Sequence, residues 1–158
     1  MPHGKNPFVR NIAWSYDASY IYFEHQPELY SSSSHIYSVR LDGTRLKKLS
    51  EGFSAASAPS VARDGIHVYF VAVTSDPADK SKRVSGIAMK NLATGENRYL
   101  IRGRSVSPKI APSGTQMIYN QITPGGSNSL WFMDLHSGEA IDLTPGRAVS
   151  TGGAFWLE

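Results

Sequence analysis

Cysteine is absent from the 158 residues, which excludes a disulfide framework, a thiolate nucleophile and a cysteine-based zinc site. Long apolar runs are missing too, since nowhere do about 18 consecutive apolar residues occur. The opening segment MPHGKNPFVRNIAW also lacks the apolar stretch of a secretory signal. The sequence therefore predicts neither membrane insertion nor a targeting signal, and it leaves the compartment open.

A strong excess of one charge is also lacking, because 16 Lys and Arg face 13 Asp and Glu for a net charge of +3. A dedicated nucleic-acid binder would carry a dense basic stripe, so we expect no nucleic-acid partner. What the chain does contain favours strands and turns: 8 Tyr, 6 Phe and 3 Trp suit pleated sheets, and 14 Gly with 9 Pro supply frequent turns.

Recognisable catalytic and cofactor motifs are missing as well. The nearest approach to a nucleophile elbow, GRSVS at 103–107, lacks the second glycine, and GGSNS at 125–129 leads into a strand rather than a helix. Five histidines occur without metal-ligand spacing. The sequence thus predicts no enzyme, no metal and no cofactor, with His25 and His35, which flank one loop, as the open alternative for a metal.

Three segments recur along the chain with a nearly constant period. AWSYDASYIYF, SVARDGIHVYF and KIAPSGTQMIY align with Asp17, Asp64 and Ser113 in register, 47 and 49 residues apart. After a variable stretch, HIYSVRLDG, GIAMKNLATG and LWFMDLHSG align in the same way. A period of about 40–50 residues is typical of propeller blades.

Each unit has the pattern of four short strands joined by tight turns. In the first unit we expect strands at about 11–15, 20–25, 35–41 and 45–50. Asp17 and Asp64 fall at hairpin entries, where a carboxylate accepts hydrogen bonds from backbone N–H groups, and Ser113 does so more weakly. A sandwich would explain the strand spacing, but not why every fourth strand repeats one pattern.

We therefore predict an all-β fold, a single partial β-propeller domain over 1–158 built from four-stranded antiparallel blades. The predicted blades span about 11–52, 58–103 and 107–148. Trp156 follows Ile110 by 46 residues, which predicts the first strand of a fourth blade at about 150–158.

The phrases AWSYDASYIYF, HIYSVRLDG and RLKKLS resemble the blade signature of TolB-type, WD40-like propellers. The resemblance covers about residues 11–148, and Trp14, Pro112 and the Asp64-Gly65 pair keep parts of the signature. Propellers of this kind occur in the TolB component of a bacterial envelope system and in the gates of prolyl-oligopeptidase-like serine peptidases. The resemblance implies a docking or gating module.

Three blades are too few for a closed ring, because propellers use typically 4–8 of them. The blade faces left exposed then need a partner. Either the chain is part of a larger propeller, or two copies close a six-bladed ring as a homodimer with two-fold symmetry. The sequence leaves both open.

One end of the predicted ring carries candidate binding residues. The connections within the middle of each blade and those between blades emerge together there, and loops on a rigid frame suit recognition. Phe53, Arg104 and Arg147 each come just after a blade-ending glycine, and Arg83 joins them on the same face. We expect a protein or peptide partner at this face, and two interpretations of its arginines stay open: solvated loop charges, or a docking site for an acidic partner at Arg104 and Arg147.

The sequence therefore favours a non-catalytic interaction module. Two alternatives stay open: the gating propeller of a serine hydrolase whose catalytic domain lies elsewhere, and a lyase-like or sugar-binding propeller with polar side chains gathered in its channel.

Overall fold

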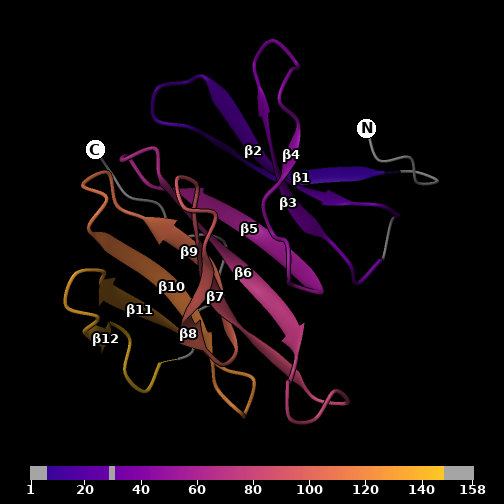
Figure 1. The fold of residues 1–158 in the computed structure, drawn as a ribbon. Helices are drawn as coiled ribbons and strands as arrows, with labels where there is room; N and C mark the ends of the chain where they lie inside the picture. The colour runs from indigo at the N-terminus through magenta and orange to yellow at the C-terminus, as the bar shows by residue number, and fades with distance from the viewer. Residues whose placement is uncertain (1–6, 29–30, 148–158) are drawn as a thin grey trace.

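The computed structural model describes residues 7–28 and 31–147, and the regular structure in these ranges is entirely β-strand. Twelve strands form three four-stranded sheets that lie side by side (Figure 1). The strands of the first sheet are β1 (Phe8–Trp14), β2 (Tyr20–Gln26), β3 (His35–Arg40) and β4 (Lys47–Lys48). Those of the second are β5 (Ala55–Val61), β6 (His67–Ser75), β7 (Arg83–Asn91) and β8 (Asn97–Arg102). The third contains β9 (Ser105–Ile110), β10 (Gln116–Ile122), β11 (Asn128–Asp134) and β12 (Ala140–Asp142).

Within each sheet the strands follow chain order, and each described pair of neighbours is antiparallel. We call the sheets blade 1, blade 2 and blade 3. Short turns connect successive strands because Gly43, Gly95 and Gly138 adopt positive φ angles of 80°, 80° and 78° between the third and fourth strands. The predicted all-β architecture of three four-stranded blades is confirmed.

The predicted strands of the first unit are present with shifted ends. β1 begins at Phe8 rather than near residue 11, and β4 is reduced to two residues because only Lys47 and Lys48 pair with β3. The expected strand of a fourth blade, at about 150–158, lies outside the described residues.

An irregularity recurs in the first strand of every blade. Asn11, Ala58 and Ser107 adopt φ angles of 50°, 51° and 55°, and the pairing with the second strand shifts register at each of these points. The three residues are spaced like Asp17, Asp64 and Ser113. An extra residue in one strand bends it and increases its twist, so the bulge is part of the repeated blade design.

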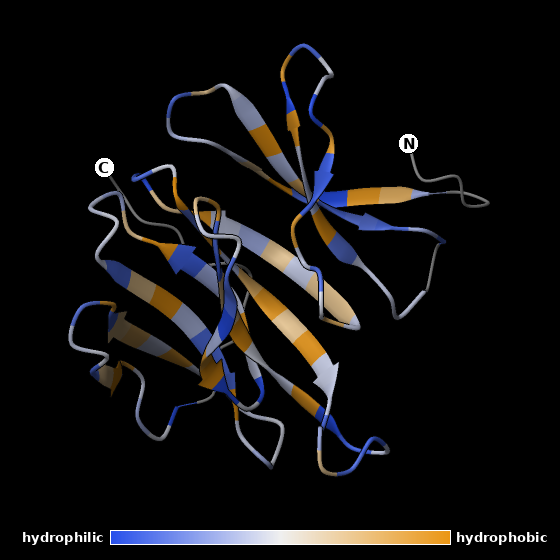
Figure 2. Ribbon diagram, in the orientation of Figure 1, coloured by the Kyte–Doolittle hydropathy of each residue, from blue (hydrophilic) through white to orange (hydrophobic). Residues whose placement is uncertain are grey.

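The core lies between the blades. β5 packs across β1, β2 and β3 of blade 1, and β9 packs across β5, β6 and β7 of blade 2. Between blades 1 and 2 the fully buried side chains include Ile36, Leu49, Val68 and Phe70. Figure 2 shows hydrophobic segments in the strands of the blades and more polar ones in most connecting loops. The apolar side chains of the strands are buried between the facing sides of adjacent sheets, as in stacked blades.

Polar contacts reinforce the junction between blades 1 and 2. The carboxylate of Glu24, which is fully buried, accepts hydrogen bonds from Arg10 Nε at 2.8 Å, Asn11 Nδ2 at 2.7 Å and the backbone N–H of Ala58 at 3.3 Å. One carboxylate therefore joins the bulges of two blades. In the next junction Ser60 Oγ accepts a single bond from the Ile110 N–H at 3.0 Å.

Over residues 7–28 and 31–147, the structure contains no helix with the length and apolar character needed to cross a bilayer.

Candidate functional site

Loops from different blades gather at the two ends of the stack. One end, which we call the loop end, collects the β2–β3, β6–β7 and β10–β11 connections together with the connections between blades. The other, the turn end, collects the short turns that join the first strand to the second and the third to the fourth in each blade. The chemistry of the two ends differs.

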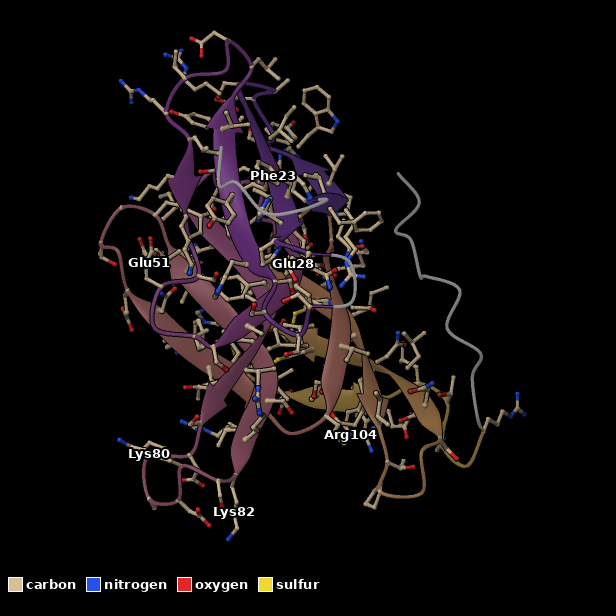
Figure 3. The ribbon with its side chains drawn as sticks, turned by 90° about the vertical axis from the view of Figure 1, so that its right-hand side faces the viewer. Phe23, Glu28, Glu51, Lys80, Lys82 and Arg104 are labelled. Carbon is tan, nitrogen blue, oxygen red and sulfur yellow. The ribbon has the colours of Figure 1, made fainter. Side chains whose placement is uncertain are left out.

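The arginines predicted from sequence lie at the loop end. Arg83 begins β7, Arg104 stands between β8 and β9, and Arg147 follows β12; all three are exposed. Backbone bonds fix Arg104, because its carbonyl oxygen accepts from Ile122 N–H at 2.7 Å. Figure 3 shows Lys80 and Lys82 at the tip of the β6–β7 loop, apart from Arg104.

These three arginine side chains have no hydrogen bond or ion pair with another described residue. Neighbouring cations are engaged: Lys82 Nζ lies 3.3 Å from Asp79 Oδ2, and the guanidinium of Arg102 lies 5.0 Å from the ring centre of Tyr99. The loop end thus presents free guanidinium groups that can bind a carboxylate.

Phe53, the remaining predicted residue, is placed differently. Its ring makes edge-on contacts with Phe70 and Tyr99, with centroid distances of 5.7 and 5.4 Å. It is half-buried and packs against the core between blades 1 and 2. Aromatic pairs of this geometry add to packing energy, so Phe53 contributes to the junction between blades.

The turn end contains a cavity of about 560 Å³ between blades 1 and 2. Its inner wall includes the apolar or aromatic side chains of Tyr22, Leu49 and Leu92, and its rim carries Arg45, Lys47, Arg63, Asp17 and Asp64. The guanidinium of Arg63, from blade 2, lies 4.4 Å from the ring centre of Tyr16, from blade 1. The cavity is therefore built from both blades.

The two carboxylates on this rim are engaged in their own turns. Asp17 accepts from Ser15 Oγ at 2.6 Å, Ser19 Oγ at 2.7 Å and the Ser19 N–H at 3.1 Å, and these bonds lower its pKa to about 2. Asp64 accepts from the Ile66 and His67 N–H groups at 2.8 and 3.0 Å. The predicted turn-stabilising role of both residues is confirmed, and Ser113 accepts more weakly from Thr115 N–H at 3.4 Å.

His25 and His35, the open alternative for a metal, face each other as register partners of β2 and β3. Burial lowers the pKa of both imidazoles. His35 Nδ1 lies 3.2 Å from Ser50 Oγ. Within the described ranges no third His, Asp or Glu joins them in a group that could hold a metal ion.

Sequence reasoning missed the cavity at the turn end. The turn sequence DGTRLKK indicates only that Arg45 and Lys47 lie in a connection that reaches the same end as Asp17 and Asp64, and it does not show the cavity. Short turns of adjacent blades, rather than long loops, make the cavity.

The three chain-ordered blades, each stacked on the previous one, define the class of fold as a β-propeller, of which this chain forms a sector. No protein-family model and no curated protein matches the sequence. Similarity to solved structures is extensive, and it shows a TolB-like β-propeller fold.

TolB from Acinetobacter baumannii superimposes with a TM-score of 0.66 at 21% identity over 89% of this chain and 33% of that one. A prolyl endopeptidase gives a TM-score of 0.68 at 14% identity, over 90% of this chain and 22% of that one. The propeller domain of the Trilobed protease from Pyrococcus furiosus gives 0.64 at 14% identity, over 90% and 44%. This chain therefore spans less than half the length of each of these three proteins, and at these identities the likeness concerns the fold.

Proposed function

We propose that this chain is a non-catalytic interaction module whose loop end binds an acidic segment of a protein or peptide. The observation that carries the proposal is the set of exposed arginines, Arg83, Arg104 and Arg147, that lack intramolecular partners on a rigid frame. Arginine forms charge-assisted, often paired hydrogen bonds with carboxylates, which gives an acidic partner its attraction to this end.

The distribution of charge supports this choice of partner. The acidic side chains near the β6–β7 loop are occupied, since Asp79 holds Lys82 and the Ser81 N–H, and Asp76 accepts from the Ala78 N–H. None of these contacts involves Arg83, Arg104 or Arg147, so the three guanidinium groups stay available to a partner. Complementary charges mainly raise the rate of association and the selectivity for a partner, and salt screens this attraction.

The test is binding of a fluorescently labelled peptide of ten glutamates, measured by anisotropy at low and high salt. The double variant Arg104→Glu with Arg147→Glu is expected to weaken binding by about tenfold or more, because it removes two exposed charge-assisted contacts and replaces them with repulsion. The matched control is Arg40→Glu with Arg98→Glu, which reverses two exposed arginines at the turn end. Unchanged binding in the first variant, equal loss in the control, or no binding by the unmodified chain would overturn the proposal.

We also propose a second copy of the chain as a partner through the outer blade faces. On the outer face of blade 1, a hollow of about 600 Å³ is lined by Ile21, Phe23 and His25 among others. The equivalent residues of blade 2 are Val68, Phe70 and Ala72, which are fully buried against blade 1. The hollow thus has the position and chemistry of an internal blade junction, and two copies with three blades each would close a ring.

Light scattering behind size exclusion over a hundredfold range of concentration tests this pairing. A mass of two chains that is lost in Phe23→Glu, with the fold retained by circular dichroism, supports it. A folded species with the mass of one chain at every concentration would refute it.

A further inference from the structure

We infer that the cavity at the turn end is a second binding site, for an organic anion in which an apolar group carries a carboxylate. The chain end of a peptide with an apolar last residue and a free small carboxylate share this chemistry. The site differs in place and in lining from the loop end, so it stands independently of the function proposed above.

The rim of the cavity carries more positive than negative charge. Both carboxylates of the rim already accept hydrogen bonds within their own turns, as described for Asp17 and Asp64. Arg45 and Lys47, by contrast, have no side-chain hydrogen bond or ion pair with another described residue. The rim therefore carries three cations, Arg45, Lys47 and Arg63, against two carboxylates, and this excess of positive charge favours a ligand with a negative group.

The inner wall accounts for the apolar part of the ligand. Leu49 and Tyr22 are buried, Leu92 is half-buried, and all three line the cavity. A volume of about 560 Å³ lies within the range of small-molecule sites, roughly 300–1,000 Å³, and such sites combine apolar walls with a few polar groups.

One lining residue distinguishes this junction from the next. Ser38 lines it and pairs with Tyr22 across β2 and β3. In blade 2 the equivalent pair is Met89 with Tyr69, and there Met89 is buried and packs with Ala62 and Tyr69 in the core facing blade 3. A small serine therefore leaves open in one junction the space that a methionine fills in the next.

The backbone of Arg45 offers a separate indication. Arg45 has a φ of 54°, a conformation that side-chain-bearing residues adopt at a cost, and in the corresponding turns of blades 2 and 3 only glycine has a positive φ. Unlike the positive φ of the three bulges, that of Arg45 is not repeated in the other blades, and non-glycine residues held in this region without a repeated structural role are found at functional sites. The strained turn places Arg45 at the rim of the cavity.

The experiment is calorimetric titration with N-acetyl-phenylalanine, with its amide as the uncharged probe. The acid is expected to bind about tenfold or more tightly than the amide, because only the acid forms charge-assisted bonds with the rim. A six-residue peptide ending in phenylalanine distinguishes the two sources: tighter binding than the single residue indicates a peptide chain end, and weaker binding indicates a small free carboxylate.

Two variants locate the site. Ser38→Met copies blade 2 and fills the cavity, so it is expected to abolish binding of the acid while the thermal midpoint stays close to that of the parent. Arg45→Ala with Lys47→Ala should reduce the preference for acid over amide by about tenfold. Equal binding of acid and amide, no binding of either, or undiminished binding in a folded Ser38→Met chain would overturn the inference.

The loop end provides the control that separates the two proposals. Arg104→Glu with Arg147→Glu should leave the affinity for N-acetyl-phenylalanine within about twofold of the parent, because those residues lie at the other end and screened charges act over about 10 Å. A loss here equal to that in Arg45→Ala with Lys47→Ala would contradict a separate site.

Discussion

Equivalent residues differ sharply in exposure between the inner junctions and the outer faces of the stack. Leu49 and Leu143 end their blades at matching positions, yet Leu49 is 1% exposed and Leu143 is 50% exposed. Leu49 has blade 2 packed against it, whereas the corresponding face of blade 3 has no described blade beyond it. The same sequence position is thus buried where another blade packs against it and exposed where none of the described blades does. The burial of these repeated positions depends on the neighbouring blade.

The largest effect we predict contrasts these two leucines. Leu49→Ala should lower the free energy of unfolding by about 3 kcal/mol, because it removes buried carbons and leaves a cavity in the junction. Leu143→Ala should lower it by less than about 1 kcal/mol, because the side chain is already half in water. Urea denaturation of the three proteins measures both values.

The difference in stability between Leu49→Ala and Leu143→Ala can also be tested by varying the protein concentration. If a second copy covers the outer face of blade 3, the cost of Leu143→Ala should rise with concentration, since binding stabilises the folded state by mass action. Equal losses for the two variants at low concentration would show that the faces do not differ as the structure indicates.

Glu24 provides the next prediction, again by comparing a junction with its repeat. Glu24→Ala should cost about 2 kcal/mol, because the half-buried Ala58 N–H and the Asn11 amide lose their acceptor, while Arg10, whose side chain is 47% exposed, can turn into water. Val71 occupies the equivalent position in blade 2 without such bonds.

Thermal or urea unfolding of Glu24→Ala, Glu24→Gln and Val71→Ala tests this account. Gln keeps one carbonyl acceptor and should recover part of the loss. If Glu24→Gln is as unstable as Glu24→Ala, the hydrogen bonds are not the source of the stability.

The sequence alone predicted the repeat, the four strands of each blade and the turn role of Asp17 and Asp64, because these depend on local patterning. It did not predict the bulges, because Asn11, Ala58 and Ser107 share a conformation but not a residue type. Arg83, Arg104 and Arg147 were expected at one end, and topology places them there.

The cavity could not be predicted because it depends on a side chain that is too small relative to its repeat. The difference between Ser38 and Met89 acquires meaning only once both are seen to pair with equivalent tyrosines and to face a neighbouring blade. The location of Phe53 likewise depends on contacts across blades, with Phe70 and Tyr99.

The bulge of blade 2 gives a prediction of opposite sign. Ala58→Gly should raise the free energy of unfolding by about 0.5–1 kcal/mol, since glycine adopts a φ of 51° without strain and the N–H to Glu24 remains. Ala56→Gly, in the extended part of the same strand, is the control and should lower it by at least as much, because glycine is less favourable there and a buried methyl group is lost. Destabilisation by both would mean that Ala58 is not strained.

The smallest effect concerns the turn between the first and second strands of a blade. This turn contains Asp17 in blade 1 and Ser113 at the equivalent position in blade 3. Hydrogen bonds from Ser15 and Ser19 lower the pKa of Asp17 from its ordinary 3.8 to about 2. Because the folded chain holds this carboxylate ionised at lower pH than the unfolded chain, its contribution to stability is complete above pH 4 and disappears as the pH falls through 2. Asp17→Ser, which copies Ser113, should therefore be slightly less stable at pH 5 and equal to the parent near pH 2. Urea midpoints at pH 5, 3 and 2 measure the difference, and a gap between the two proteins that does not close on acidification would show that the charge on Asp17 does not stabilise the turn.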